Sequence, residues 1–199
     1  MKIICIGQNY RTDNTTVPEK PLFFMKPETS MVVRNRPFFV PDFSKELYYE
    51  IELVLHINKV GKCIQPRFAH TYYDAIALGL DFTAMDVLRQ CKEQGLPWET
   101  AKAFDYSAPI GEFIKKEELG DLNNLHFQLM KNGECVQDGN SSEMIFNFDN
   151  IISYVSQYVT LKMGDLIFTG TPAGAGPAKI NDFLEGYLNG TRRLRCRIK

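Results

Sequence analysis

Two glutamates that alternate with apolar residues in one short segment are the first candidates for chemistry. In the run LYYEIELVLHI, residues 47–57, Glu50 and Glu52 are two positions apart. Because successive side chains of a strand point to opposite faces, both carboxylates lie on the same face. Glu is depleted in strands, so this placement favours a positive partner. A hard divalent cation such as Mg²⁺, Mn²⁺ or Ca²⁺ prefers such oxygen ligands, and a solvated antiparallel strand face is the alternative.

A third carboxylate and a lysine extend this set. Asp81 is the only ionisable residue of the apolar run 75–85. A buried carboxylate is costly unless it is paired, protonated or bound to metal, although Asp81 could instead cap a helix. Asp86, at the start of the next helical pattern, is the better capping candidate. Lys102 stands between two alanines and before Phe104, which is typical of a partner for buried acids or of a snorkelling surface residue.

A glycine-rich segment, GTPAGAGP at residues 170–177, follows an apolar strand pattern. It lacks the Gly-Lys-Ser/Thr ending of a phosphate-binding P-loop, and no helix pattern follows as a dinucleotide fold requires. Its bare backbone N–H groups and the Thr171 hydroxyl could hold a carboxylate or an oxyanion, while a turn without a ligand is the alternative. Three acids, a lysine and such a loop suit a metal that keeps positions open for a substrate with two adjacent oxygens.

The elements that must position these residues are mostly strands. Alternation and turn residues predict two hairpins, 125–137 with an Asn-Gly turn at 132–133 and 183–199 with an Asn-Gly turn at 189–190. Helical periodicity predicts helices at 86–94 and 148–158 and a short one between 66 and 74. Residues 98–109 read as irregular, and 8–16 as a mobile loop. Further strands are predicted at 2–6, 22–25, 31–33, 38–40, 47–57 and 165–169.

We therefore expect a β-dominated α+β fold in one domain that spans residues 1–199. Residues 1–45 would add N-terminal strands and the mobile loop to the same core. The chain has 23 Lys and Arg against 24 Asp and Glu, so no overall field draws it to nucleic acid or anionic lipid. No run approaches the roughly 20 apolar residues of a membrane span, and we expect a cytoplasmic protein.

The cysteines and histidines offer little chemistry. Five scattered cysteines, odd in number and without a CxxC spacing, indicate reduced thiols that serve as small core residues. His56 would share the face of Glu50 and Glu52 as a core residue or a neighbour of the site. His70 and His126 are expected to have surface or capping roles.

Short motifs occur in a fixed order along nearly the whole chain. They are GQNY (7–10), LFFMKP (22–27), YEIEL (49–53), DFTAMD (81–86), GLPW (95–98), AKAFD (101–105), SEMIF (142–146) and GDLIFTGTPAG (164–174). With these motifs the chain resembles the fumarylacetoacetate hydrolase family, and especially its short members that act on acylpyruvates and oxaloacetate.

This resemblance implies a mixed β-roll of the C-terminal type of that family, and usually a homodimer. It also implies Mg²⁺ or Mn²⁺, with Ca²⁺ as an ion that crystals could show. The ion would be bound by Glu50, Glu52 and Asp81, and the substrate would be contacted by Lys102 together with the loop residues Gly170 and Thr171.

The chain departs from the family pattern at four positions. The active members of the family carry a His and a Glu in the loop after Asn-Tyr, and the matching positions here are Asp13 and Thr16. The substrate-binding Arg and Gln of the family correspond to Met85 and Leu88. Arg11 could swing in from the loop as a substitute that binds substrate.

The leading hypothesis is a metal-dependent hydrolase that cleaves a C–C bond in a small 2-oxo or 1,3-diketo acid of acylpyruvate or fumarylpyruvate type. Lys102 would balance the carboxylates and hold or protonate the enolate. Decarboxylation of oxaloacetate or keto–enol isomerisation needs no aimed water, so these reactions tolerate the loss of the His and Glu better. The alternatives are a protein that binds metal and carboxylate without turnover, and a structural domain with a solvated acidic face.

Overall fold

The computed structural model describes residues 1–11, 17–33 and 36–199 of the chain. The predicted mobile loop falls mainly on residues 12–16, so this prediction, and with it Asp13 and Thr16, lies outside the described residues.

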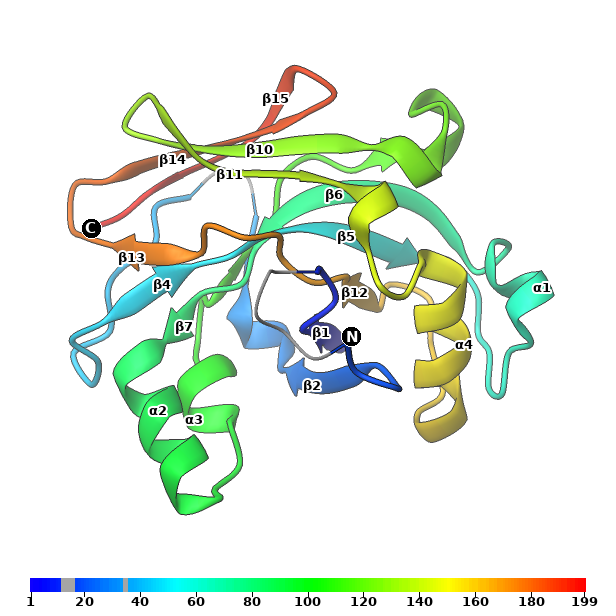
Figure 1. The fold of residues 1–199 in the computed structure, drawn as a ribbon, viewed down its shortest axis with the longest axis horizontal. Coiled ribbons are helices and arrows are strands. Elements are labelled where there is room, and N and C mark those ends of the chain that lie inside the picture. The colour runs from blue at the N-terminus through cyan, green and yellow to red at the C-terminus, as the bar shows by residue number, and fades with distance from the viewer. Residues whose placement is uncertain (12–16, 34–35) are drawn as a thin grey trace.

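A six-stranded sheet forms the centre of the molecule (Figure 1). Only β1 and β12 run parallel within it, and the other neighbours are antiparallel. Its strands, in spatial order, are β2 (Leu22–Lys26), β1 (Ile3–Gly7), β12 (Leu166–Phe168), β5 (Ile51–Ile57), β6 (Tyr73–Leu80) and β9 (Ile114–Lys115).

An antiparallel four-stranded sheet lies over β5 and β6 (Figure 1). Its order is β11 (Glu134–Asn140), β10 (His126–Lys131), β14 (Phe183–Leu188) and β15 (Thr191–Arg197). Both predicted hairpins are confirmed. Their Asn-Gly turns have positive φ at both residues, 54° and 89° at Asn132 and Gly133, as a two-residue turn between twisted strands requires.

The predicted strand 47–57 is interrupted at Glu50. β4 (Leu47–Tyr49) pairs with β13 (Gly176–Ala178) and β7 (Thr83–Ala84), whereas β5 belongs to the central sheet. The two halves separate because they have different hydrogen-bonding neighbours. A further pair is formed by β3 (Met31–Val32) and β8 (Ala108–Pro109), and the predicted strand 38–40 is reduced to a bridge between Phe38 and Ile198.

The α-helices are α1 (Pro66–Ala69), α2 (Met85–Gln94), α3 (Glu99–Lys102) and α4 (Phe148–Tyr158), and single 3₁₀ turns cover Glu28–Ser30, Lys116–Glu118, Leu122–Asn124 and Ser141–Glu143. α3 corrects the expectation of an irregular segment. The capping prediction for Asp86 is wrong, because Ala84 is the N-cap and Asp86 lies inside the first turn. Gly95, with φ of 65°, ends α2.

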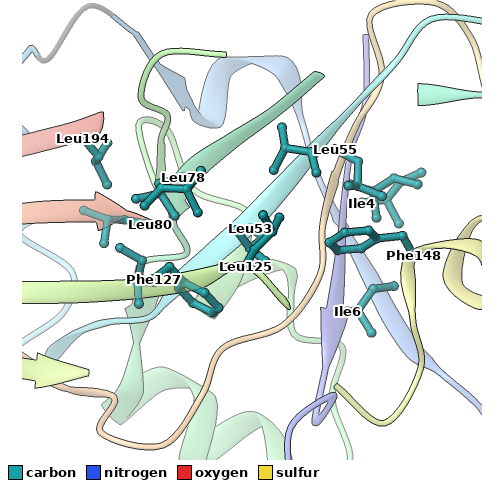
Figure 2. Packing of buried hydrophobic residues seen from close by; sticks show 14 of the residues in the cluster. Ile4, Ile6, Leu53, Leu55, Leu78, Leu80, Leu125, Phe127, Phe148 and Leu194 are labelled. Atoms are coloured by element: carbon teal, nitrogen blue, oxygen red, sulfur yellow. The ribbon is translucent and has the colours of Figure 1, made fainter. Parts of the chain in front are cut away.

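The larger hydrophobic cluster fills the space between the two main sheets and continues to α4. Figure 2 shows Leu53 with Leu78 and Phe127 in this cluster, and Ile4 with Phe148 at its other end. A smaller cluster covers the opposite face of the central sheet and includes Ile3, Cys5, Val54, Ala77 and Phe168. Glu52 is two residues from Val54, so its side chain lies on the face of this smaller cluster.

The cysteine prediction holds only in part. All five thiols are free, as expected, and Cys5, Cys91 and Cys196 are buried. Cys63 and Cys135 are exposed, so they do not serve as core residues.

Within the described part of the chain, no helix combines the length and the apolar character that a membrane crossing needs.

Candidate functional site

The pairing of β5 with β6 brings the predicted acids together. Glu52 lies opposite Gly79, and Ile51 lies opposite Leu80. In the next step along the two strands, the Asp81 N–H donates to the Glu50 carbonyl oxygen at 2.8 Å. Residues paired across antiparallel strands point to the same face, so this register places all three carboxylates on one face of the sheet.

Lys102, the last residue of α3, binds two of these acids. Its Nζ lies 2.5 Å from Glu50 Oε2 and 3.0 Å from Asp81 Oδ2, and the residue is 6% exposed. Burial by itself lowers the pKa of Lys102, but Asp81 and Glu50 raise it well above the usual value. Lys102 is therefore a charged partner of buried acids and not a snorkelling surface residue.

Lys26 is a second buried ammonium, which the sequence analysis did not single out. It ends β2, is 1% exposed, and places Nζ 2.7 Å from Asp81 Oδ1. The same Nζ donates to the Ser107 hydroxyl at 2.8 Å and to the Phe82 carbonyl at 3.2 Å. Burial raises the pKa of Asp81, but Lys102 and Lys26 more than compensate and bring it below the usual value. The available signal was a lysine that directly follows the apolar residues 22–25.

Glu52 is held by the glycine-rich loop. Its carboxylate is 2% exposed, and its Oε2 accepts the Gly170 N–H at 2.7 Å. Burial raises the pKa of Glu52 well above its usual value, and the nearby charges of Asp81 and Glu50 raise it further. The Gly170 amide, which we expected to bind substrate, is used here to hold an acid of the site.

Asn9 fixes the start of this loop. Its side-chain amide donates to the Thr169 carbonyl at 2.7 Å and to the Phe146 carbonyl at 3.0 Å. Gly170 has φ of 102°, and a Cβ at this position would lie 2.7 Å from Asn9 Cβ. Only glycine meets both requirements, which explains why this residue type stands directly beside the carboxylate of Glu52.

Thr171 is half-buried, and its Oγ1 accepts a hydrogen bond from Gln137 Nε2 at 2.8 Å. Gln137, on β11, is 2% exposed and is a further residue that the sequence analysis missed. A polar residue at an inward position of a strand was its only signal.

Arg11 lines a cavity of about 580 Å³ that Pro172 and Ala173 of the glycine-rich loop also line. The described residues that line this cavity are Tyr10, Arg11, Asp138, Ser142, Glu143, Met144, Pro172 and Ala173. Arg11 thus lies near the loop that carries Thr171, and its role as a substrate ligand stays a prediction.

The histidines lie away from the acids of the site. His56 Nδ1 is 2.7 Å from Asp74 Oδ1, and its side chain is 36% exposed, so the expectation of a core residue or a neighbour of the site is wrong. His126 is exposed and pairs with Asp138 at 2.7 Å, in agreement with a surface role.

The charges of the three acids suit a divalent cation, but the arrangement of their side chains does not. Burial raises the pKa of Glu52, the negative charges of Asp81 and Glu50 raise it further, and a cation would relieve this repulsion. Across residues 1–11, 17–33 and 36–199, however, no three acidic, histidine or cysteine side chains are arranged to hold one ion. Lys102 contacts two of the carboxylates instead. The donor types fit Mg²⁺ or Mn²⁺, and the three-acid metal centre remains a prediction.

Known proteins are similar to this chain in both sequence and fold. The mouse protein named oxaloacetate tautomerase FAHD1, mitochondrial, is 41% identical, over 99% of this chain and 91% of the relative. The Dictyostelium discoideum protein named oxaloacetate decarboxylase, mitochondrial, is 36% identical, over 95% of this chain and 89% of the relative.

A solved structure is similar to the chain as well. The fumarylpyruvate hydrolase from Pseudomonas aeruginosa, in complex with Mn²⁺ and pyruvate, is 32% identical and superimposes with a TM-score of 0.94. The match covers 100% of this chain and 89% of that one. The expected β-dominated fold is therefore confirmed. The family model described as fumarylacetoacetate (FAA) hydrolase C-terminal matches residues 2–199, and the chain belongs to the fumarylacetoacetate hydrolase family.

Proposed function

We propose that this protein is an enzyme that interconverts the keto and enol forms of a small 2-oxo dicarboxylic acid of the oxaloacetate type. The observation that carries the proposal is Lys102, a buried ammonium held at 2.5 Å from Glu50 and 3.0 Å from Asp81. The name of the mouse relative supports the same reaction. The comparisons favour this alternative over the C–C hydrolase that we expected first.

Tautomerisation moves one proton between C3 and the oxygen on C2, and it neither adds water nor breaks a C–C bond. The site therefore has to stabilise negative charge on an oxygen and let a proton pass, and a fixed, buried cation stabilises such a charge well. Hydrolysis would need an aimed water in addition. The positions where the family resemblance expects the activating His and Glu are Asp13 and Thr16.

In this proposal Lys102 is the residue that meets the C2 oxygen. Its raised pKa keeps it protonated at neutral pH, so it acts as a fixed positive charge and a hydrogen-bond donor. An ammonium has three hydrogens, and Glu50 and Asp81 direct two of them. The third would donate to the substrate oxygen on which negative charge develops.

The glycine-rich loop would bind the neighbouring carboxylate of the substrate. Its Thr171 hydroxyl lies on a loop that Asn9 and Gln137 hold in place. Arg11, in the adjoining cavity, would meet the second carboxylate of a dicarboxylic acid by a charge-assisted hydrogen bond.

A divalent metal would be held by Glu50, Glu52 and Asp81. When bound, Mg²⁺ or Mn²⁺ would supply the Lewis acidity that stabilises an enolate. The Mn²⁺ in the fumarylpyruvate hydrolase structure supports this part of the proposal.

Decarboxylation of oxaloacetate is the second candidate, because the Dictyostelium relative carries that name. It draws on the same stabilisation of negative charge, since loss of CO₂ leaves an enolate of pyruvate. The two reactions differ in their products, so one assay separates them.

The test supplies the protein with oxaloacetate, acetylpyruvate or fumarylpyruvate in the presence of Mg²⁺ or Mn²⁺. Enol absorbance in the ultraviolet follows tautomerisation, and pyruvate release, coupled to lactate dehydrogenase, follows decarboxylation or hydrolysis. We expect accelerated loss of the oxaloacetate enol without matching release of pyruvate. Glu52→Ala, measured in parallel, should lose this acceleration.

Each other outcome points to another function. Pyruvate that appears as fast as the enol disappears would identify a decarboxylase, and cleavage of acetylpyruvate or fumarylpyruvate would identify a hydrolase. If wild type and Glu52→Ala process all three substrates equally slowly, the enzyme proposal fails and a protein that only binds metal and carboxylate remains.

We also propose that residues 1–199 fold as one domain, because the larger core cluster includes residues from Ile4 to Ile198.

A homodimer is proposed from the family resemblance alone, and light scattering in solution tests it. The cytoplasmic location remains a proposal beside the mitochondrial names of two relatives, and fractionation of cells tests it.

A further inference from the structure

Gln137 connects three segments that meet at the site. It lies on β11, is 2% exposed, and its side chain contacts the strand that carries the glutamates and the glycine-rich loop. Its Oε1 accepts the Ile51 N–H at 2.9 Å, between Glu50 and Glu52 in the sequence. Its Nε2 donates to Thr171 Oγ1 at 2.8 Å and to the Pro172 carbonyl at 3.1 Å.

Chemistry alone fixes the orientation of this amide group. The Ile51 N–H can only donate, so the atom that faces it must be the amide oxygen. The Pro172 carbonyl can only accept, so the atom that faces it must be the amide nitrogen. Both requirements select the same orientation, in which the nitrogen uses both of its hydrogens and the oxygen accepts one hydrogen bond.

This orientation determines what the Thr171 hydroxyl can do. A hydroxyl has one hydrogen and two lone pairs, and Gln137 Nε2 occupies one lone pair. The Thr171 hydrogen cannot point at Gln137, because an N–H group faces it there. It is therefore available to a ligand, and an anionic oxygen is the ligand that gains most from a neutral donor in a half-buried site.

We propose that Gln137 is a positioning residue that turns the Thr171 hydroxyl into a hydrogen-bond donor and so selects for an anionic oxygen at the glycine-rich loop. The proposal rests on the function proposed above and deepens it, since it names how a carboxylate is preferred. Gln137 itself is not required to touch the substrate.

The surrounding backbone makes this arrangement rigid. A Cβ on Gly174 would collide with the Val136 carbonyl oxygen, and a Cβ on Gly139 would lie 2.8 Å from Pro172 Cβ. β11 and the loop are thus closely packed on both sides of Gln137. Because the loop has little room to shift, the direction of the Thr171 hydroxyl depends on the group that Gln137 presents to it.

The test is a double-mutant cycle with Gln137→Glu and Thr171→Val, read out as the Kd of pyruvate by calorimetry with Mn²⁺ supplied. In Gln137→Glu an oxygen still accepts the Ile51 N–H, but the second oxygen replaces the donor that faces both Thr171 and the Pro172 carbonyl. The Thr171 hydroxyl then turns to donate to this oxygen and is lost to the ligand. Each single variant should bind pyruvate about 10- to 100-fold more weakly, as expected for a lost hydrogen bond to a charged group.

The second substitution should add little once the first is present. If Gln137 acts through Thr171, Gln137→Glu should cost less than about 3-fold in the Thr171→Val background. Thr171→Ser, which keeps the hydroxyl, should retain most of the affinity. Gln157→Glu on the exposed side of α4 is the matched control and should leave the Kd unchanged.

Losses that multiply in the double variant would show that Gln137 acts independently of Thr171, and this would overturn the proposal. The same holds if Gln137→Glu binds pyruvate as tightly as wild type, or if wild type does not bind pyruvate. Unfolding in urea identifies a variant that does not fold, and Gln137→Met, which also removes the donor, then takes the place of Gln137→Glu in the cycle.

The cycle separates this inference from the proposed function. Coupled losses of pyruvate affinity in a protein that does not tautomerise oxaloacetate would refute the function and support the role of Gln137. Tautomerisation by the wild-type protein together with multiplying losses would support the function and refute the role of Gln137.

Discussion

Lys26 and Lys102 approach Asp81 from two sides. Their Nζ atoms lie 2.7 Å from Oδ1 and 3.0 Å from Oδ2, and Asp81 is 1% exposed. Removing one partner of a buried ion pair leaves an uncompensated charge, which costs far more than the pair contributes. Among the ion pairs of the described residues, Lys26 pairs with Asp81 alone, whereas Lys102 pairs with both Glu50 and Asp81. Lys26 therefore serves chiefly to keep Asp81 ionised and in place.

We expect Lys26→Met to lower the free energy of unfolding by about 3–5 kcal/mol, as for other broken buried pairs. Urea unfolding measures this difference, and Lys20→Met, at an exposed position, should change it by less than about 0.5 kcal/mol. Equal stability of Lys26→Met and wild type would contradict the ionic role of Lys26.

Residue type alone identified part of this site. Glu50 and Glu52 share a face because strands have a period of two, and Lys102 stood out among small neighbours. The sequence did not reveal Lys26 and Gln137, because their roles depend on contacts with residues that lie far away in the sequence. No local pattern states that the end of β2 meets Asp81, or that β11 faces the loop at Thr171.

The backbone conformation of Gly170 determines the path of the glycine-rich loop. Its φ of 102° is costly for any residue with a Cβ, and a Cβ here would also lie 2.7 Å from Asn9 Cβ. Because the Gly170 amide binds Glu52, a shift of this residue would move an acid of the site.

Gly170→Ala should lower stability by about 2–4 kcal/mol, since backbone strain and steric overlap add, and should reduce kcat/KM for the enol at least about 10-fold. Gly120→Ala is the control, because Gly120 has φ of 74° but no atom within 4 Å of its added Cβ. It should lose only about 1 kcal/mol and keep its activity. Similar losses in both variants would show that the contact with Asn9 is unimportant.

The first turn of α2 is tied down by Asp86. Its carboxylate accepts the Ser44 hydroxyl at 2.7 Å and the Lys45 N–H at 2.9 Å. Burial raises the pKa of Asp86, but these hydrogen bonds lower it more, so the pKa in the folded protein is below the usual value. A depressed pKa contributes stability above the unfolded-state pKa of about 3.9, and this contribution is lost as the pH falls through the folded-state pKa.

Asp86→Asn should therefore destabilise the protein by about 1 kcal/mol at pH 7 and by less as the pH falls below about 4. Urea unfolding at pH 7 and near pH 3 measures this, with Asp42→Asn at an exposed position as the control. A difference from wild type that is the same at both pH values would refute the assigned role of the charge.

Turn residues and periodicity in the sequence predicted the elements whose hydrogen bonds join residues close together in the chain. The Asn-Gly turns and the periodicity of α4 were sufficient for the hairpins and for the helix. The break at Glu50 was missed because it follows from the pairing of β4 with β13 and β7, which lie elsewhere in the sequence.

In the whole molecule, the stacking of two sheets supports the site from behind. Leu53 is fully buried in the cluster between them and lies next to Glu52 in the chain (Figure 2). The packed face of β5 thus fixes the strand whose other face carries Glu52.

Leu53→Ala should lower stability by about 2–5 kcal/mol through the cavity it leaves. Leu96→Ala, at a residue that is 49% exposed, should cost much less. Thermal unfolding followed by circular dichroism measures both, and equal losses would show that the space between the sheets is not the core of the fold.

The central claim is that the Lys102 ammonium promotes proton transfer between C3 and the C2 oxygen of a 2-oxo dicarboxylic acid. The most direct measurement is the rate of enol loss from oxaloacetate in a stopped-flow instrument, for wild type, Lys102→Met and the exposed control Lys162→Met, with Mg²⁺ supplied. We expect wild type and Lys162→Met to accelerate the reaction alike, and folded Lys102→Met to be at least about 100-fold slower, as for the removal of one donor to a developing oxyanion. A Lys102→Met protein that is folded and as fast as wild type would contradict the account.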